Sequence, residues 1–167
     1  MNKLLHFCLV LLQFLFLVDS ARALDANFEK DTATANLMLG PADSVSVSVV
    51  TIERPQEFPY SKSYTWGGDD TTSPTRIIKK VIVLRNGQSL FIPLSAYADL
   101  GSPRRISLLK LSSHGFRLVV SGGDAAGSYD AILDFKKNEI SRRRVVSGEF
   151  PKEVWEETTF SFNHLNN

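Results

Sequence analysis

The chain has 167 residues, with 19 Lys and Arg against 18 Asp and Glu, so its formal net charge is only +1. Such a neutral balance lacks the basic surface that nucleic-acid binding needs, and we expect no nucleic-acid partner. Cys8 is the single cysteine. The rest of the chain therefore contains no disulfide, thiol nucleophile or thiolate metal site.

Residues 1–23 have the layout of a secretory signal peptide, with Lys3, an apolar run over 4–18, and small residues at Ala21 and Ala23. We expect cleavage after Ala23. The run is shorter than the roughly 20 apolar residues of a membrane span, so an uncleaved anchor is the less favoured alternative. We expect a periplasmic or secreted protein, without stable membrane insertion after cleavage.

Cleavage would leave 144 residues, enough for one domain with its own core. Lys3, Asp19 and Arg22 would leave with the signal, so 17 basic and 17 acidic residues would remain. Residues 24–43 are polar without a clear period, and we interpret them as an N-terminal leader, with a short strand or helical turn possible at 35–39. Residues 44–167 form the expected single β-rich domain.

From residue 44 onward the dominant period is two, which is the strand signal. Residues 44–49 alternate Ser and Val, and a further strand is possible at 60–66. Asn86-Gly87 favours a type I′ hairpin between 77–85 and 88–94. This turn would place Val83 opposite Leu90 and Ile82 opposite Phe91. Because both faces of the hairpin are apolar, we expect it in the middle of the sheets.

Five more strands are predicted at 106–111, 116–121, 128–135, 140–147 and about 155–162. No long segment has the 3.6-residue period of an amphipathic helix. Eight or nine strands with short connections indicate an all-β fold. We expect an antiparallel β-sandwich, with a small up-and-down β-barrel as the alternative.

Two loops combine glycine with acidic residues, at 66–70 and 122–128. If they met at one end of the sandwich, carboxylate and carbonyl oxygens could bind calcium. The candidate ligands are Asp69, Asp70, Asp124 and Asp130. The alternative is that glycine and aspartate simply form turns here.

Tyr60, Tyr64 and Trp66 lie an even number of residues apart, so on one strand they would share a face. An exposed stripe of Tyr64 and Trp66 could stack on sugar rings. A half-buried structural strand is the alternative.

Arg142, Arg143 and Arg144 are consecutive, so two would point to one face of a strand and the third to the other. On an edge strand they would oppose aggregation or form an interaction edge. An acidic partner could also come from the same chain, with Glu149, Glu153, Glu156 and Glu157 as the candidates.

Catalytic patterns are few. Only His114 and His164 follow the signal, and no Gly-x-Ser-x-Gly motif is present. Paired carboxylates such as Asp130 and Asp134 leave glycoside hydrolysis open.

We therefore expect a non-enzymatic periplasmic binding or interaction module, acting on an unknown envelope protein or glycan. The alternatives are a calcium- or carbohydrate-binding accessory domain and a carboxylate-dependent hydrolase.

Overall fold

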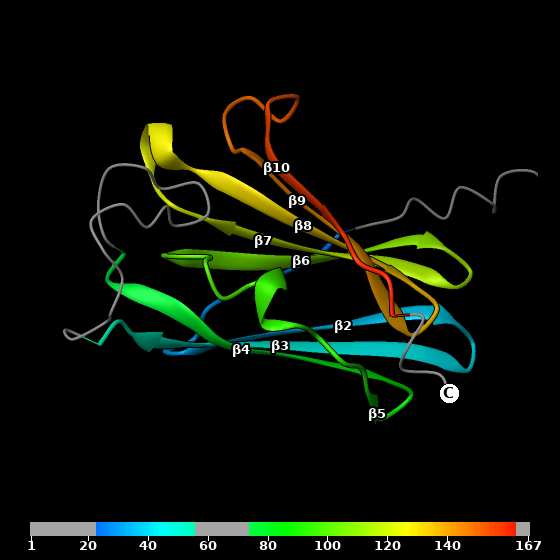
Figure 1. The fold of residues 1–167 in the computed structure, drawn as a ribbon. Helices are drawn as coiled ribbons and strands as arrows, with labels where there is room; N and C mark the ends of the chain where they lie inside the picture. Colours follow the sequence, from blue (N-terminus) through cyan, green and yellow to red (C-terminus); the bar gives the residue numbers. More distant parts are fainter. Residues whose placement is uncertain (1–22, 56–73, 163–167) are drawn as a thin grey trace, which may run out of the picture.

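The computed structural model describes residues 23–55 and 74–162, which form two antiparallel β-sheets facing each other (Figure 1). The six-stranded sheet has the order β1-β6-β7-β8-β9-β10, and the four-stranded sheet has the order β2-β3-β4-β5. Neither sheet closes on itself, so the expected β-sandwich is confirmed and the barrel is not formed.

The strands of the six-stranded sheet are β1 (Leu24–Asn27), β6 (Pro103–Ser112), β7 (Gly115–Gly122), β8 (Tyr129–Lys136), β9 (Glu139–Ser147) and β10 (Val154–Thr159). Those of the other sheet are β2 (Thr32–Gly40), β3 (Asp43–Glu53), β4 (Arg76–Arg85) and β5 (Gln88–Ser89). Two single-turn 3-10 helices, η2 (Leu94–Ala96) and η3 (Ala125–Gly127), lie in the connections. The segment that carries η2 leads from the four-stranded sheet back to β6 (Figure 1).

The core fills the space between the sheets with alternate side chains of each strand. In β3 the valines Val45, Val47 and Val49 are buried while the intervening serines are half-buried on the outer face. In β8 the inward residues are Tyr129, Ala131, Leu133 and Phe135. This alternation follows from the two-residue period of a strand.

Residues 24–43 are not an unpatterned leader; this part of the sequence prediction is wrong. They form β1 and β2, and β2 is paired with β3 over almost its whole length. The inward residues of β2 are Ala33, Ala35, Leu37 and Leu39, all buried. The period of two was hidden because two of these four are alanines, and Met38 adds an exposed apolar side chain on the outer face.

The Asn86-Gly87 hairpin has the predicted register, with Arg85 opposite Gln88 and Leu84 opposite Ser89. Both turn residues have positive φ, 52° and 79°, as a type I′ turn requires. Its expected central position is wrong, because β5 is only two residues long and lies at the edge of its sheet. Leu90 still donates its N–H to the Val83 oxygen at 2.9 Å, but Phe91 projects into solvent.

The later hairpins agree with the sequence prediction within a few residues. β6 and β7 pair through the Ser113-His114 turn, and β8 and β9 pair through Lys137-Asn138. The strand predicted at 60–66 lies outside the described residues, as do residues 1–22 of the signal peptide predicted at 1–23. Within 23–55 and 74–162 there is no helix with the length and apolar character of a membrane span.

Candidate functional site

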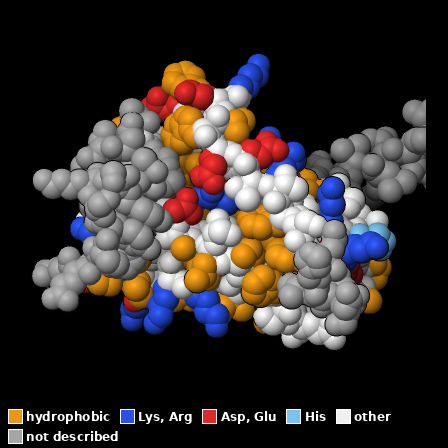
Figure 2. Space-filling view, viewed as in Figure 1, with side chains coloured by type: hydrophobic (Ala, Val, Ile, Leu, Met, Phe, Trp, Pro, Cys, Tyr) orange, Lys and Arg blue, Asp and Glu red, His pale blue; other side chains and the backbone are white. Residues whose placement is uncertain are grey.

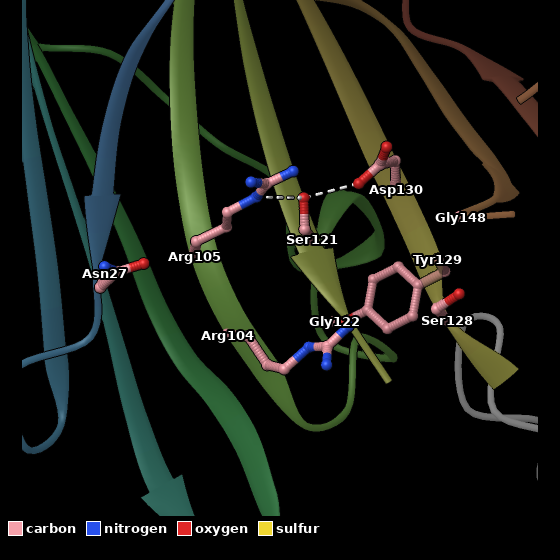
Figure 3. Close-up of a pocket in the computed structure, with 9 residues that line it drawn as sticks. All are labelled: Asn27, Arg104, Arg105, Ser121, Gly122, Ser128, Tyr129, Asp130 and Gly148. Atoms are coloured by element: carbon pink, nitrogen blue, oxygen red, sulfur yellow. Dashed lines mark hydrogen bonds between the residues drawn. The ribbon is translucent and has the colours of Figure 1, made fainter. Parts of the chain in front are cut away.

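An open polar pocket of about 350 Å³ lies at the end of the six-stranded sheet where β7 runs into β8. It is lined by Asn27, Arg104, Arg105, Ser121, Gly122, Ser128, Tyr129, Asp130 and Gly148 (Figure 3). The lining residues come from β1, β6, β7 and β8, from the residue just before β8 and from the residue just after β9. One end of the sandwich thus brings together five separate stretches of chain.

A β-bulge in β6 brings two arginines to this pocket. Pro103 pairs with Gly122 and Arg105 pairs with Ser121, so Arg104 is the extra residue between two consecutive partners. In a regular strand, neighbouring side chains point to opposite faces. The bulge breaks that alternation, so Arg104 and Arg105 are both exposed on the pocket side.

Three side chains on neighbouring strands form a hydrogen-bonded row across the pocket (Figure 3). The Ser121 hydroxyl donates to Asp130 Oδ1 at 2.6 Å, and Arg105 Nε donates to Ser121 Oγ at 3.4 Å. Ser121 therefore lies between the guanidinium and the Asp130 carboxylate, the single carboxylate among the described residues that line the pocket. Arg104 takes part in no ion pair with any described residue.

Glycines allow the walls of the pocket to pack closely. A Cβ on Gly122 would lie 2.4 Å from the Tyr129 hydroxyl oxygen, and one on Gly148 would lie 2.7 Å from Ser128 Oγ. The Tyr129 hydroxyl donates to the Gly101 oxygen at 2.8 Å. This hydrogen bond therefore connects β8 to the segment that precedes β6.

The loops that border the pocket contain two non-glycine residues in the left-handed region, Ser102 at φ 47° and Ala125 at φ 40°. Backbone hydrogen bonds hold these loops together: Gly123 donates to the Ser102 oxygen at 3.2 Å, and Gly148 donates to the Ser128 oxygen at 2.8 Å. Such conformations cost of order 1–3 kcal/mol each and are often found at binding sites. Two of the five non-glycine residues with positive φ in the described chain thus border the pocket.

Of the calcium candidates, the structure brings Asp130 into the pocket, whereas Asp124 lies exposed in the neighbouring loop and does not line it. Tyr64, Trp66, Asp69 and Asp70 lie outside the described residues. In the described part of the chain, no three His, Cys, Asp or Glu side chains are grouped so as to hold a metal ion. Calcium binding through the two loops stays a prediction.

The three consecutive arginines do not form an edge, and this prediction is wrong. β9 pairs with β8 on one side and with β10 on the other, so it is an inner strand. Arg142 binds Asp134 at 2.8 Å and approaches Glu157 at 3.9 Å. Arg143 points to the opposite face and pairs with Asp99 and Glu156, with only 1 % of its side chain exposed. The glutamates of β10 thus supply the intrachain partners that the sequence suggested.

Two carboxyl groups bound by these arginines have shifted pKa values. Burial raises the pKa of Asp99, and the charge of Arg143 only partly offsets this. Burial also acts to raise the pKa of Asp134, but hydrogen bonds from Arg117 and Arg142 outweigh it, so the pKa lies below its usual value. Asp134 lies on β8 and Asp99 in the connection between η2 and β6, and neither lines the pocket.

Sequence reasoning missed Arg104, Arg105 and Asn27. Arg104-Arg105 precedes the alternation of Ile106 and Leu108, and in a regular strand only one of the two arginines would face outward. No residue pattern marks the bulge, so only the pairing of β6 with β7 reveals the shared face.

No family model, curated protein or solved structure matches this chain.

Proposed function

We propose that this chain is a non-enzymatic binding module of the bacterial periplasm or the secreted fraction, and that its pocket binds a small anionic ligand such as an acidic or phosphorylated sugar of an envelope glycan. The observation that carries the proposal is the pair Arg104 and Arg105 on one pocket wall. No carboxylate within the described residues forms an ion pair with either arginine.

Guanidinium groups recognise carboxylate and phosphate through two parallel hydrogen bonds. Arg117 and Arg142, farther along the same sheet, are already engaged, since both bind Asp134. Asn27 and Ser128 add an amide and a hydroxyl to the lining. This set offers two charged anchors and neutral polar groups, which is the combination that an anionic sugar requires.

The lining favours binding over hydrolysis. Within 23–55 and 74–162, Asp130 is the one carboxylate that lines the pocket, and it accepts a hydrogen bond from Ser121, whereas glycoside hydrolysis uses two carboxyls across a cleft. His114, the one histidine among the described residues, lies in the β6–β7 turn at the opposite end of β7. A histidine base beside Ser121 is therefore missing from the described part of the chain, and the group that accepts the hydrogen bond of Ser121 is the Asp130 carboxylate.

The test is isothermal titration of the mature chain with inorganic phosphate, a hexose phosphate, a hexuronic acid and the neutral hexose. We expect binding of the charged compounds only, with about tenfold weaker affinity for Arg104→Ala and for Arg105→Ala. Lys110→Ala is the matched control, because Lys110 is an exposed cation at the far end of the same strand.

Equal affinity for neutral and charged hexose would overturn the proposal that the ligand is anionic. Equal losses in Lys110→Ala and in the arginine variants would show that the pocket is not the site. Turnover of the hexose phosphate by the wild-type chain would overturn the non-enzymatic assignment.

A further inference from the structure

A second surface, independent of the pocket, combines exposed apolar side chains with two lysines. We call it the apolar–basic patch and define it by Lys79, Lys80, Phe91 and Leu94. Phe91 and Leu94 are 63 % and 66 % exposed, among the highest values of the large hydrophobic side chains described. In Figure 2 hydrophobic side chains gather near η2 and the chain that follows β5, and Lys and Arg side chains lie along the lower rim.

Phe91 is held in its exposed position by aromatic neighbours. It meets Phe162 edge-on with ring centroids 5.8 Å apart, and Phe160 stacks on Phe162 at 6.2 Å. Phe160 and Phe162 pack in turn against the core. The exposed Phe91 ring is therefore connected to the core through its contacts with these two phenylalanines.

A β-bulge brings the two lysines to one face, as another does for Arg104 and Arg105. Val50 pairs with Lys80 while Thr51 pairs with Ile78, so Lys79 is the extra residue of β4. Both lysines are exposed, and neither forms an ion pair with a described residue. Lys80 borders a shallow groove that Phe91 also lines.

Strand addition by a peptide does not suit this place. The edge of β4 is already used on both sides of the lysines: Leu90 donates to the Val83 oxygen at 2.9 Å, and Ser102 donates to the Arg76 oxygen at 2.9 Å. Too little free backbone is left to hold an extended chain. A second copy placed on the same patch would bring its own Lys79 and Lys80 towards these two, and like charges would oppose that contact.

We infer that the apolar–basic patch contacts an anionic lipid surface, with Phe91 and Leu94 entering the interface and Lys79 and Lys80 facing the headgroups. Apolar side chains beside basic ones are the combination that holds peripheral proteins on anionic bilayers. This is a reversible surface contact of the mature chain, and it needs no membrane-spanning segment.

The experiment is co-sedimentation of the mature chain with phosphatidylcholine vesicles, with and without a phosphatidylglycerol fraction. We expect binding only to the anionic vesicles, and release at high salt. Lys79→Ala and Lys80→Ala should each weaken the partition coefficient roughly fivefold. Phe91→Ser/Leu94→Ser should weaken it about tenfold or more.

Lys110→Ala and Leu111→Ser are the matched controls, because both residues are exposed on β6 in the other sheet. Far-UV circular dichroism checks folding. If the double variant does not fold, Leu94→Ser and the lysine variants carry the test. Absence of binding to anionic vesicles overturns the inference, as does equal loss in the β6 controls. Sedimentation equilibrium that shows a dimer disrupted by Phe91→Ser would assign the patch to a second copy.

Discussion

At the end of the sandwich opposite the pocket, Arg85 joins turns from both sheets. Its Nε donates to Asp43 Oδ1 at 2.9 Å, and Asp43 is the first residue of β3 after the β2–β3 turn. Its Nη1 donates to the backbone oxygen of Lys137, in the turn between β8 and β9, and to that of His114 at 3.5 Å. One nearly buried guanidinium therefore fixes three turns that are far apart in the sequence.

Replacing this guanidinium should destabilise the whole domain. We expect Arg85→Met, which keeps most of the aliphatic stem, to lower the free energy of unfolding by about 2–4 kcal/mol, because the carboxylate and carbonyl partners lose a nearly buried charge-assisted donor. Urea denaturation measures this loss. Lys80→Met is the control, since an exposed site without partners should change stability by no more than about 0.5 kcal/mol. A loss for Arg85→Met as small as the control's would contradict the role given to Arg85.

Asp134 makes stability depend on pH in the acidic range. Its folded-state pKa lies below the usual value of 3.8, because hydrogen bonds from Arg117 and Arg142 outweigh the effect of burial. A lowered folded-state pKa stabilises the native state above the unfolded-state pKa, and this contribution is lost as pH falls through the folded value.

We therefore expect the unfolding free energy of the wild type to fall as pH drops from about 5 toward 2. Asp134→Asn should be less stable at neutral pH by about 1–3 kcal/mol and should show a smaller fall. Urea midpoints measured across this range check the prediction, with Asp124→Asn as the exposed control. Parallel curves for the wild type and Asp134→Asn would contradict it.

At the scale of the elements, bulges decide which cations share a face. β4 has an extra residue at Lys79 and β6 has one at Arg104, and each time two consecutive basic residues come to the outer surface. Without the bulges, one residue of each pair would point into the core. The same device therefore provides both the pocket arginines and the patch lysines.

The stability of the domain should also depend on the absence of a side chain at the end of β7. Gly122→Ala would place a methyl group 2.4 Å from the Tyr129 hydroxyl, so the ring must move and its hydrogen bond to Gly101 must weaken. We expect a loss of about 1–3 kcal/mol in thermal or urea unfolding, together with weaker ligand binding. Gly40→Ala is the control, because its added Cβ would meet nothing closer than 3.9 Å. Equal stability of the two variants would show that the pocket wall can relax.

At the scale of the whole molecule, the two sheets are unequal, and the larger one extends beyond the smaller at β9 and β10 (Figure 1). β7 and β8 lie in the middle of the six-stranded sheet, and their inward residues include the stacked pair Phe116 and Phe135, with centroids 4.4 Å apart. β10 is an edge strand, and nearly all of its residues are exposed.

Hydrogen exchange should follow this layout. We expect the amides of β7 and β8 to exchange only through global unfolding, and those of β1, β5 and β10 to exchange through local opening with much lower protection. Exchange measured residue by residue by NMR checks the order. Protection of β10 equal to that of β8 would mean that its free edge is covered in solution.

The sequence by itself determined the fold class and most strand positions, because the two-residue period of 44–49 or of 129–135 records directly which side chains face the core. It also determined the Asn86-Gly87 turn, whose positive φ angles depend on those two residues alone. It hid β2, whose inward face begins with two alanines.

Only the tertiary structure decided which strands pair, and the pairing decided which residues form the candidate site. From the sequence alone, Arg142 to Arg144 suggest an edge strand, but β10 pairs with β9 and makes it an inner strand. Arg104 and Arg105 would point to opposite faces of a regular strand, but the bulge in β6 exposes both on one face. Strand order and bulges depend on contacts between residues far apart in the chain. The local pattern of side chains therefore does not encode them.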